Sequence, residues 1–261
     1  TRYMQVTGVQ TCALPILDAA QQTGKLSYDG YKKVWSDEFN GDSLNRADWN
    51  VETHEKGWVN NELQEYVDSA ENIQVKDGKL IINPVKKVTD GDTGSTKEAA
   101  SYTSGRVSTQ NKQTFIYGRF ECRAKVPKGQ GYLPAFWLMA NDENVYGQWP
   151  RCGEIDCMEV MGQETNKAYG TLHYGNPHSQ SQGTYTITDG ADFSDDFHIF
   201  TCDWEPGKIT WYVDGVKYHE ESDWYSTTVG QGTLTYPAPF DQPFYIILNL
   251  AVGGSWVGNP N

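Results

Sequence analysis

The sequence is poor in cysteine, in basic residues and in long apolar runs, and each deficit excludes a class of protein. Five cysteines in 261 residues are an odd number, which does not indicate a disulfide framework. Cys152 and Cys157, on one extended strand, would lie too far apart for a bridge. No cysteine or histidine spacing indicates zinc. No apolar run approaches the roughly 18 residues of a membrane-spanning helix, so we expect no membrane partner.

The shortage of basic residues narrows the choice of partner further. Lys and Arg number 21 against 34 Asp and Glu, which gives a formal net charge of −13. A chain with this charge repels nucleic acid and anionic membranes, so neither is expected to bind. A heavily sulfated polymer is disfavoured as a substrate for the same reason.

Aromatic residues and glycine are abundant, and they indicate β-structure. The chain has 16 Tyr, 9 Trp and 26 Gly, which suit strands and tight turns. Two hairpins are predicted, at Asp77-Gly78 and at Asp214-Gly215. No repeat, linker or long helix is visible, so the sequence predicts one all-β domain built as a sandwich of two antiparallel sheets. The longer expected strands are 102–109, 115–126, 134–139, 168–174, 184–188, 197–204 and 244–252.

The N-terminal segment differs from the rest of the chain. Residues 1–20 have no initiator Met at position 1, no signal-peptide pattern and no strand pattern. The run from Gly8 to Ile16 resembles translated sequencing-adapter sequence. We therefore expect residues 1–26 to be disordered or non-native, and residues 27–261 to form the domain.

The most informative stretch places three carboxylates within six residues, at Glu154, Asp156 and Glu159. On a regular strand Glu154 and Asp156 share a face, and Glu159 falls on the opposite one. One extra residue at Cys157-Met158, a β-bulge, would return Glu159 to the same face. The alternative is an acidic edge strand with solvated carboxylates. Alternation with Ile, Met and Val favours one packed face and one functional face.

Two Glu side chains on one face suit glycoside hydrolysis. One carboxylate attacks the anomeric carbon while the other, still protonated, protonates the leaving oxygen. Retention of configuration requires the two carboxyl groups to lie about 5–5.5 Å apart. Crowding of like charges would also raise one pKa and keep that group protonated near neutral pH.

The pattern Glu-Ile-Asp-x-x-Glu resembles the signature of glycoside hydrolase family 16, in its laminarinase-like branch. The resemblance runs from about Trp35 to Asn261 and includes further stretches. It implies a β-jelly-roll sandwich of two bent antiparallel sheets, concanavalin-like, with a concave glycan cleft. It also implies a retaining endo-glycosidase that hydrolyses internal β-1,3-glucosidic bonds of laminarin-type β-glucans by double displacement. The further stretches are 35–39, 60–66, 102–106, 118–121, 134–139, 211–215 and 248–254.

The resemblance also implies residue roles. Glu154 would be the nucleophile, Glu159 the acid/base, and Asp156 the group that steers the nucleophile. His173 matches a position near the acid/base, although a strand His is more often structural. Trp35, Trp204 and Trp211 are assigned to the core. The expected substrate-binding residues are Asn61, Glu65, Arg106, Trp137, Trp149, His173 and Trp256.

No cofactor is expected for catalysis, but many family members carry a structural calcium ion. Glu38 and the Gly78 carbonyl match two of its usual ligands, while a third, an Asp on the final strand, is absent. The chain is expected to lack the family's final strand, which would leave a sheet edge uncovered.

Three alternative functions stay open from the sequence. They are a mixed-linkage β-1,3-1,4-glucanase, a transglycosylase with the same residues, and a non-catalytic glucan-binding module, which the two glutamates disfavour. The expected partner is a β-glucan polysaccharide. The protein is expected to be a monomer and to be extracellular or periplasmic.

Overall fold

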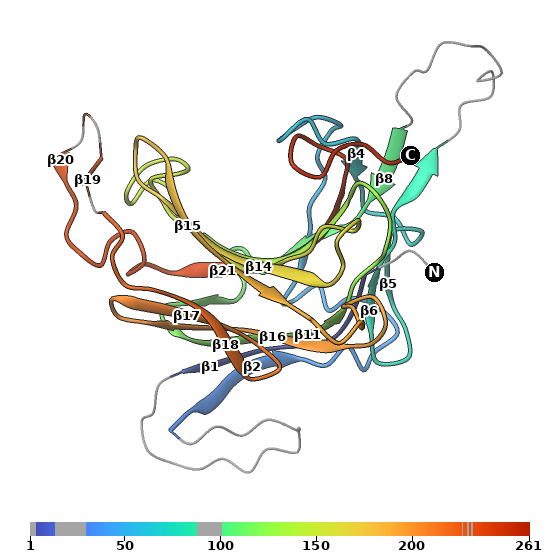
Figure 1. The fold of residues 1–261 in the computed structure, drawn as a ribbon, viewed down its shortest axis with the longest axis horizontal. Helices are drawn as coiled ribbons and strands as arrows, with labels where there is room; N and C mark the ends of the chain where they lie inside the picture. The colour runs from blue at the N-terminus through green and yellow to red at the C-terminus, as the bar shows by residue number, and fades with distance from the viewer. Residues whose placement is uncertain (1–3, 14–29, 88–100, 226, 229, 231) are drawn as a thin grey trace.

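The computed structural model describes residues 4–13, 30–87, 101–225, 227–228, 230 and 232–261. In these ranges the chain forms strands, turns and loops, with no α-helix. No described helix is therefore long and apolar enough to cross a membrane. Two eight-stranded sheets dominate the fold (Figure 1). The prediction of an all-β sandwich is confirmed.

The first sheet, here called the outer sheet, carries the N-terminal strands. It is antiparallel throughout, and β2 pairs with β1 beside the main path. Its order is β18 (Val216–Glu221), β17 (Lys208–Val213), β16 (His198–Glu205), β11 (Gly118–Lys125), β1 (Met4–Ala13), β6 (Leu80–Ile82) and β5 (Ile73–Val75), with β2 at Lys32–Asp37.

The second sheet, here called the cleft sheet, carries the acidic stretch near its middle. It is also antiparallel, and β10 (Thr114–Phe115) pairs with β21 beside the main path. Its order is β15 (Ser179–Thr186), β14 (Lys167–Tyr174), β13 (Glu154–Glu159), β12 (Tyr132–Ala140), β21 (Phe244–Val252), β9 (Arg106–Ser108) and β3 (Asn50–Val51).

Two small sheets complete the described structure. Figure 1 shows the segments that carry them rising on either side of the cleft sheet. One small sheet contains the single parallel pair of described strands, β4 with β8, whereas the two large sheets of the sandwich are antiparallel. Their strands are β4 (Gln64–Tyr66), β8 (Ser101–Ser104) and β7 (Val85–Lys87) in one, and β19 (Thr227–Thr228) and β20 (Gly232–Thr233) in the other.

The core fills the space between the two large sheets. Every residue of β21 is buried, which fits a central strand covered on both faces. Trp204 and Trp211 are fully buried, and Trp35 is half-buried against the same cluster, as predicted. Burial of large apolar side chains, at about 25 cal/mol per Å² of apolar surface, is the main force that holds the two sheets together.

Both predicted hairpins are present. Asp77 and Gly78 have φ of 52° and 69°, and Asp214 and Gly215 have φ of 49° and 80°. Positive φ at both central residues is the requirement of a type I′ turn, which Asp-Gly satisfies with little strain. The first turn joins β5 to β6 and the second joins β17 to β18.

The expectation of disorder does not hold for residues 4–13, while the expectation that the segment is non-native stays a prediction. These residues form β1, which pairs with β11 on one side and with β6 and β2 on the other. Met4 and Val6 are fully buried. The sequence shows no strand pattern here because two register shifts, at residues 6–8 and 11–12, interrupt the alternation of inward and outward residues along β1. Residues 14–26 lie outside the described part of the chain.

The outer sheet is consequently continuous at this place. Because β1 is hydrogen-bonded on both sides, β11 and β6 present no open edge there. The expected loss of the family's final strand stays a prediction.

A pair of substitutions tests whether β1 belongs to the core. Val6→Asp places a charge at a fully buried position, and we expect it to cost about 3 kcal/mol or more and to lower Tm by about 10 °C. Thr7→Asp on the opposite face, beside Arg123, should change Tm little. The measurement is thermal unfolding by circular dichroism, and equal melting of the two variants would contradict the burial of β1.

Candidate active site

A large cleft lies over the cleft sheet. Its volume is about 950 Å³, and its floor comes from β9, β12, β13, β14, β15 and β21. Two loops, within residues 52–62 and 253–257, supply further lining. Segments far apart in the sequence therefore meet at one open groove.

The β-bulge in β13 places all three predicted acids in this cleft. Trp137 of β12 pairs with Asp156, but Phe136 pairs with Met158, so Cys157 is the extra residue. The pairing with β14 shifts at the same place. Cys157 and Met158 are buried in the core, whereas Glu154, Asp156 and Glu159 line the cleft. The predicted bulge is confirmed, and Cys152 and Cys157 are both unbridged.

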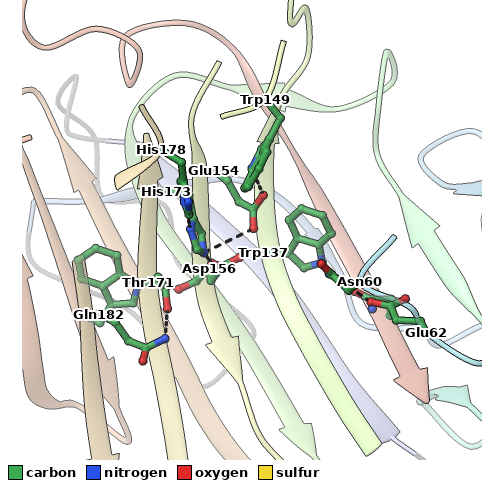
Figure 2. A network of polar contacts seen from close by, with 12 residues as sticks. Asn60, Glu62, Trp137, Trp149, Glu154, Asp156, Thr171, His173, His178 and Gln182 are labelled. Atoms are coloured by element: carbon green, nitrogen blue, oxygen red, sulfur yellow. Dashed lines mark hydrogen bonds and ion pairs between the residues drawn. The ribbon is translucent and has the colours of Figure 1, made fainter. Parts of the chain in front are cut away.

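Glu154 is held from the solvent side by an aromatic residue. Nε1 of Trp149 donates a hydrogen bond to Oε2 of Glu154 at 2.8 Å, which Figure 2 shows as a dashed line. Oε1 of Glu154 lies 4.0 Å from Nε2 of His173. Burial, and then the charge of Asp156, raises the pKa of Glu154 to about 8.

Asp156 is the most buried of the three acids, at 3% exposure. Its Oδ2 lies 3.2 Å from Nε2 of His173. Nε1 of Trp211, from the outer sheet, donates to its backbone carbonyl at 2.8 Å and ties the two sheets together under the site. Burial raises the pKa of Asp156 to about 7.

Glu159 completes the group at the far end of the bulge. Its pKa is raised well above the usual range by burial and then by the charges of Asp156 and Glu154. Three carboxyls in one poorly hydrated groove do not all ionise together, because each charge disfavours the next. The three carboxyls therefore lose their protons in separate steps, which lets a protonated and an ionised carboxyl stand side by side, as acid-assisted nucleophilic chemistry requires.

His173 lies at a different place from the one predicted. The register pairs it with Glu154, whereas Tyr169 pairs with Glu159. His173 therefore contacts the Glu154–Asp156 end of the group instead of the Glu159 end. Burial lowers its pKa, which favours the neutral imidazole. Its Nδ1 lies 2.9 Å from Nε2 of His178, on the turn between β14 and β15.

A second part of the cleft is a stack of aromatic and cationic side chains. The Arg106 guanidinium lies between two indoles, 4.8 Å from the Trp137 ring and 5.2 Å from the Trp58 ring. Nε of Arg106 donates to Oε2 of Glu52, and this pair is buried. The Trp58 ring also stacks on His54 at 3.5 Å. The Arg106 charge is compensated by Glu52 and holds the two indoles in place.

The predicted tryptophans all line the cleft. Nε1 of Trp137 donates to Oδ1 of Asn249 at 2.7 Å, and Nδ2 of Asn249 donates to the Tyr66 hydroxyl at 3.0 Å. Trp149 and Trp256 stay 45% and 43% exposed, so their rings are available to a ligand. Aromatic faces beside polar groups are typical of carbohydrate subsites.

Two predicted residues do not line the cleft. Asn61 is exposed and donates to Ser255, and Glu65 is the outward residue of β4. Asn60 and Glu62, on either side of Asn61, and Tyr66, next to Glu65, line it instead. Asn60 and Asn61 both have positive φ, at 52° and 56°, and this turn changes which side chains face inward. The alternation of a regular strand could not predict which side chains of this turn face the cleft.

Several cleft residues were not predicted, although they share polar or aromatic chemistry. Their signal was weak, because most of them lie on loops or on β15, whose polar alternation resembles a solvated edge. Gln182, for example, donates to Thr171 on the neighbouring strand within the cleft sheet. Among the missed residues are Glu52, His54, Trp58, Asn60, Glu62, His178, Gln180, Gln182 and Asn249.

The residues suggested for calcium lie outside the cleft. A side chain on Gly78 would begin 3.9 Å from Oδ1 of Asn40, so the Asp77-Gly78 turn lies beside the segment that contains Glu38. Carboxylate, carbonyl and amide oxygens, as at Glu38, Gly78 and Asn40, are the ligand types that calcium prefers.

Comparison with known proteins gives consistent results. The model of the family described as glycosyl hydrolases family 16 matches residues 60–261. Glucan endo-1,3-beta-glucosidase A1 of Niallia circulans is 41% identical over 244 residues, which cover 88% of this chain and 35% of that protein. The glucan endo-1,3-beta-glucosidase of Cryptopygus antarcticus is 43% identical over 231 residues, covering 86% and 81%. The structure of an endo-beta-1,3-glucanase from Pyrococcus furiosus superposes with a TM-score of 0.71 at 38% identity, covering 87% and 86%.

Proposed function

Because the chain belongs to glycosyl hydrolase family 16, we propose that it is a retaining endo-β-1,3-glucanase acting on laminarin-type glucans. The observation that carries this proposal is the bulge in β13. Because of this bulge, the side chains of Glu154, Asp156 and Glu159 all face the same cleft. An open groove, in place of a closed pocket, suits attack within a long chain.

The geometry supports a double displacement. Glu154 attacks the anomeric carbon and forms a glycosyl-enzyme ester, while the Glu159 carboxyl gives its proton to the departing glycosidic oxygen. Glu159 then removes a proton from water, which attacks the same carbon and releases Glu154. Asp156 and Trp149 hold the nucleophile, and Asp156 helps to keep the Glu159 proton in place.

The cleft lining supports a neutral polysaccharide as the substrate. Indole faces alternate with amide and hydroxyl groups, and the buried Arg106 charge is already compensated by Glu52. Nothing in this lining favours sulfate groups. Similarity to two glucan endo-1,3-beta-glucosidases supports β-1,3-linked glucose.

One substrate panel tests the proposal. Reducing sugar released from laminarin, lichenan, agarose and carrageenan is measured for the native chain, and proton NMR follows the first anomer formed from laminarin. We expect release from laminarin with the β-anomer first. Release from agarose alone would refute the substrate, and the α-anomer first would refute retention. A large share of longer oligosaccharides at high substrate concentration would favour transglycosylation over hydrolysis.

The stack around Arg106 leads to a prediction about binding. Arg106→Lys keeps the charge but loses the planar group that lies on Trp58 and Trp137, so KM for laminarin should rise about tenfold. The value of kcat should change less than about threefold, since the acids are untouched. Arg123→Lys, which lies over Phe197 outside the cleft, is the matched control. Equal KM values for the two variants would contradict a binding function for the stack.

We also propose a structural calcium ion at Glu38 and Gly78, supported by the position of the Gly78 turn beside the Asn40 amide oxygen, two residues from Glu38. Calcium should raise Tm by about 2–5 °C over an EDTA-treated sample. Glu38→Gln should lose this increase, whereas Glu71→Gln, at an exposed ion pair, should keep it. A Tm that does not depend on calcium would refute the site.

A polymeric substrate further supports an extracellular or periplasmic location, since a long glucan is accessible outside the cytoplasm. We propose in addition that the protein acts as a monomer. Gel filtration with light scattering tests the oligomeric state. Assay of culture supernatant and periplasm from the producing cell tests the location.

A further inference from the structure

The Glu154 end of the cleft contains a compact group of three potential metal ligands. One ligand atom each from Glu154, Asp156 and His173 lies within 4.8 Å of the other two, and no other such group of three acidic, His or Cys residues occurs among the residues the structure describes. They come from adjacent strands, β13 and β14. Figure 2 shows the two carboxylates converging on the imidazole.

One oxygen of this group is buried without a hydrogen bond. Oδ2 of Asp156 has no hydrogen-bond partner among the described residues, and the carboxylate is 3% exposed. Its ionic contact is Nε2 of His173, at 3.2 Å. No described Lys or Arg forms an ion pair with Glu154 or Asp156. A neutral imidazole brings no charge to this contact, and two buried carboxylates without a Lys or Arg are costly to ionise, so the position favours a bound cation.

The imidazole is oriented as a ligand. Nε2 of His173 faces both carboxylates, while Nδ1 lies 2.9 Å from Nε2 of the exposed His178. When Nδ1 donates to His178, the Nε2 lone pair points at Asp156. Metal-binding histidines are usually held in this way through their second nitrogen.

We propose that Glu154, Asp156 and His173 bind a divalent transition-metal ion of the Zn²⁺ type. Zinc bonds of about 2.0–2.2 Å to nitrogen and oxygen set neighbouring ligands roughly 3.3–3.6 Å apart. The 3.2 Å separation of Asp156 and His173 lies just below this range and the 4.0 Å separation of Glu154 and His173 just above it, so each needs a shift of a few tenths of an ångström at most. An imidazole with two carboxylates suits zinc better than calcium or magnesium, and the open cleft leaves room for water as a fourth ligand.

The consequence is reversible inhibition. A metal ion that holds the Glu154 carboxylate removes the nucleophile and occupies the place of the reacting sugar. Metal and glucan should therefore compete. Protons compete as well, because the ligands must be deprotonated, so affinity should rise with pH. The inhibition rests on the proposed function, whereas binding of the ion does not.

Calorimetry with ZnCl₂ and the EDTA-treated full chain tests the site. We expect one ion per chain, with affinity lowered at least about tenfold in His173→Gln. His198→Gln is the matched control, since His198 pairs with Asp214 on the outer sheet. X-ray absorption at the zinc edge should show one imidazole among oxygen ligands. No binding up to about 1 mM Zn²⁺, or equal binding by the native chain and His173→Gln, would overturn the proposal.

Glu159→Gln separates this proposal from the proposed function. Glu159 is not one of the three ligands, so this variant should bind zinc although its catalysis is impaired. Zinc binding by a chain without glucanase activity would refute the function and leave the site intact. Glucanase activity that zinc does not inhibit, in a chain that fails to bind zinc, would refute the site and leave the function intact.

Discussion

Glu154→Gln is expected to lower kcat on laminarin by about 10⁴-fold or more, because no other group can form the glycosyl-enzyme ester. The amide is close in size to the carboxylate, and the indole of Trp149 still has an oxygen to donate to. The loss should therefore come from chemistry and not from a disturbed cleft.

The same variant should be more stable than the native chain. The folded-state pKa of Glu154 is raised to about 8, so between its unfolded pKa, near 4.3, and that value the folded state holds a proton that the unfolded chain releases. Stability is consequently lost as pH rises through this interval. Gln carries no charge, so Tm at neutral pH should rise by about 2–4 °C, and the difference should vanish at acidic pH.

Glu65→Gln is the control for this result. Glu65 is an exposed carboxylate close to the cleft that does not line it, so its kcat, KM and Tm should match those of the native chain. Activity of Glu154→Gln within about tenfold of native would rule out Glu154 as the nucleophile. A strongly lowered Tm would indicate that the loss of activity reflects misfolding.

Local chemistry explains which parts of the fold could be predicted from the sequence. Asp77-Gly78 and Asp214-Gly215 fix their turns through φ, which depends on the two residues themselves. The bulge could be predicted because Glu154 and Glu159 reach one face only if Cys157 is extra. Each of these inferences needs no knowledge of distant contacts.

The remaining features depend on contacts between distant segments. Glu52 is 54 residues from Arg106, so no spacing rule shows that it compensates the buried guanidinium. The register of β14 against β13 decides that His173 faces Glu154, and a strand pattern does not specify register across a bulge. β1 is accommodated in the outer sheet by its partners despite an irregular sequence.

Glu159→Gln should give the second large effect, and its size should depend on the leaving group. Loss of the general acid should lower kcat/KM on laminarin by about 10²–10⁴-fold, because the glycosidic oxygen must then leave without a proton. A dinitrophenyl β-glucoside oligomer has a leaving group that needs no proton. Its glycosylation rate should stay within about tenfold of native, measured as the first burst of dinitrophenol.

The pH dependence of this variant provides the sharper test. In the native chain the acid must hold its proton, and burial together with Asp156 and Glu154 raises the pKa of Glu159 well above its usual range. The activity should therefore fall on the alkaline side as pH rises through that pKa. Gln has no proton to lose, so this alkaline limb should disappear in the variant, while the acidic limb from ionisation of the nucleophile remains. An unchanged alkaline limb would assign the acid to another residue, and Asp156, whose pKa is raised to about 7, is the group to substitute next.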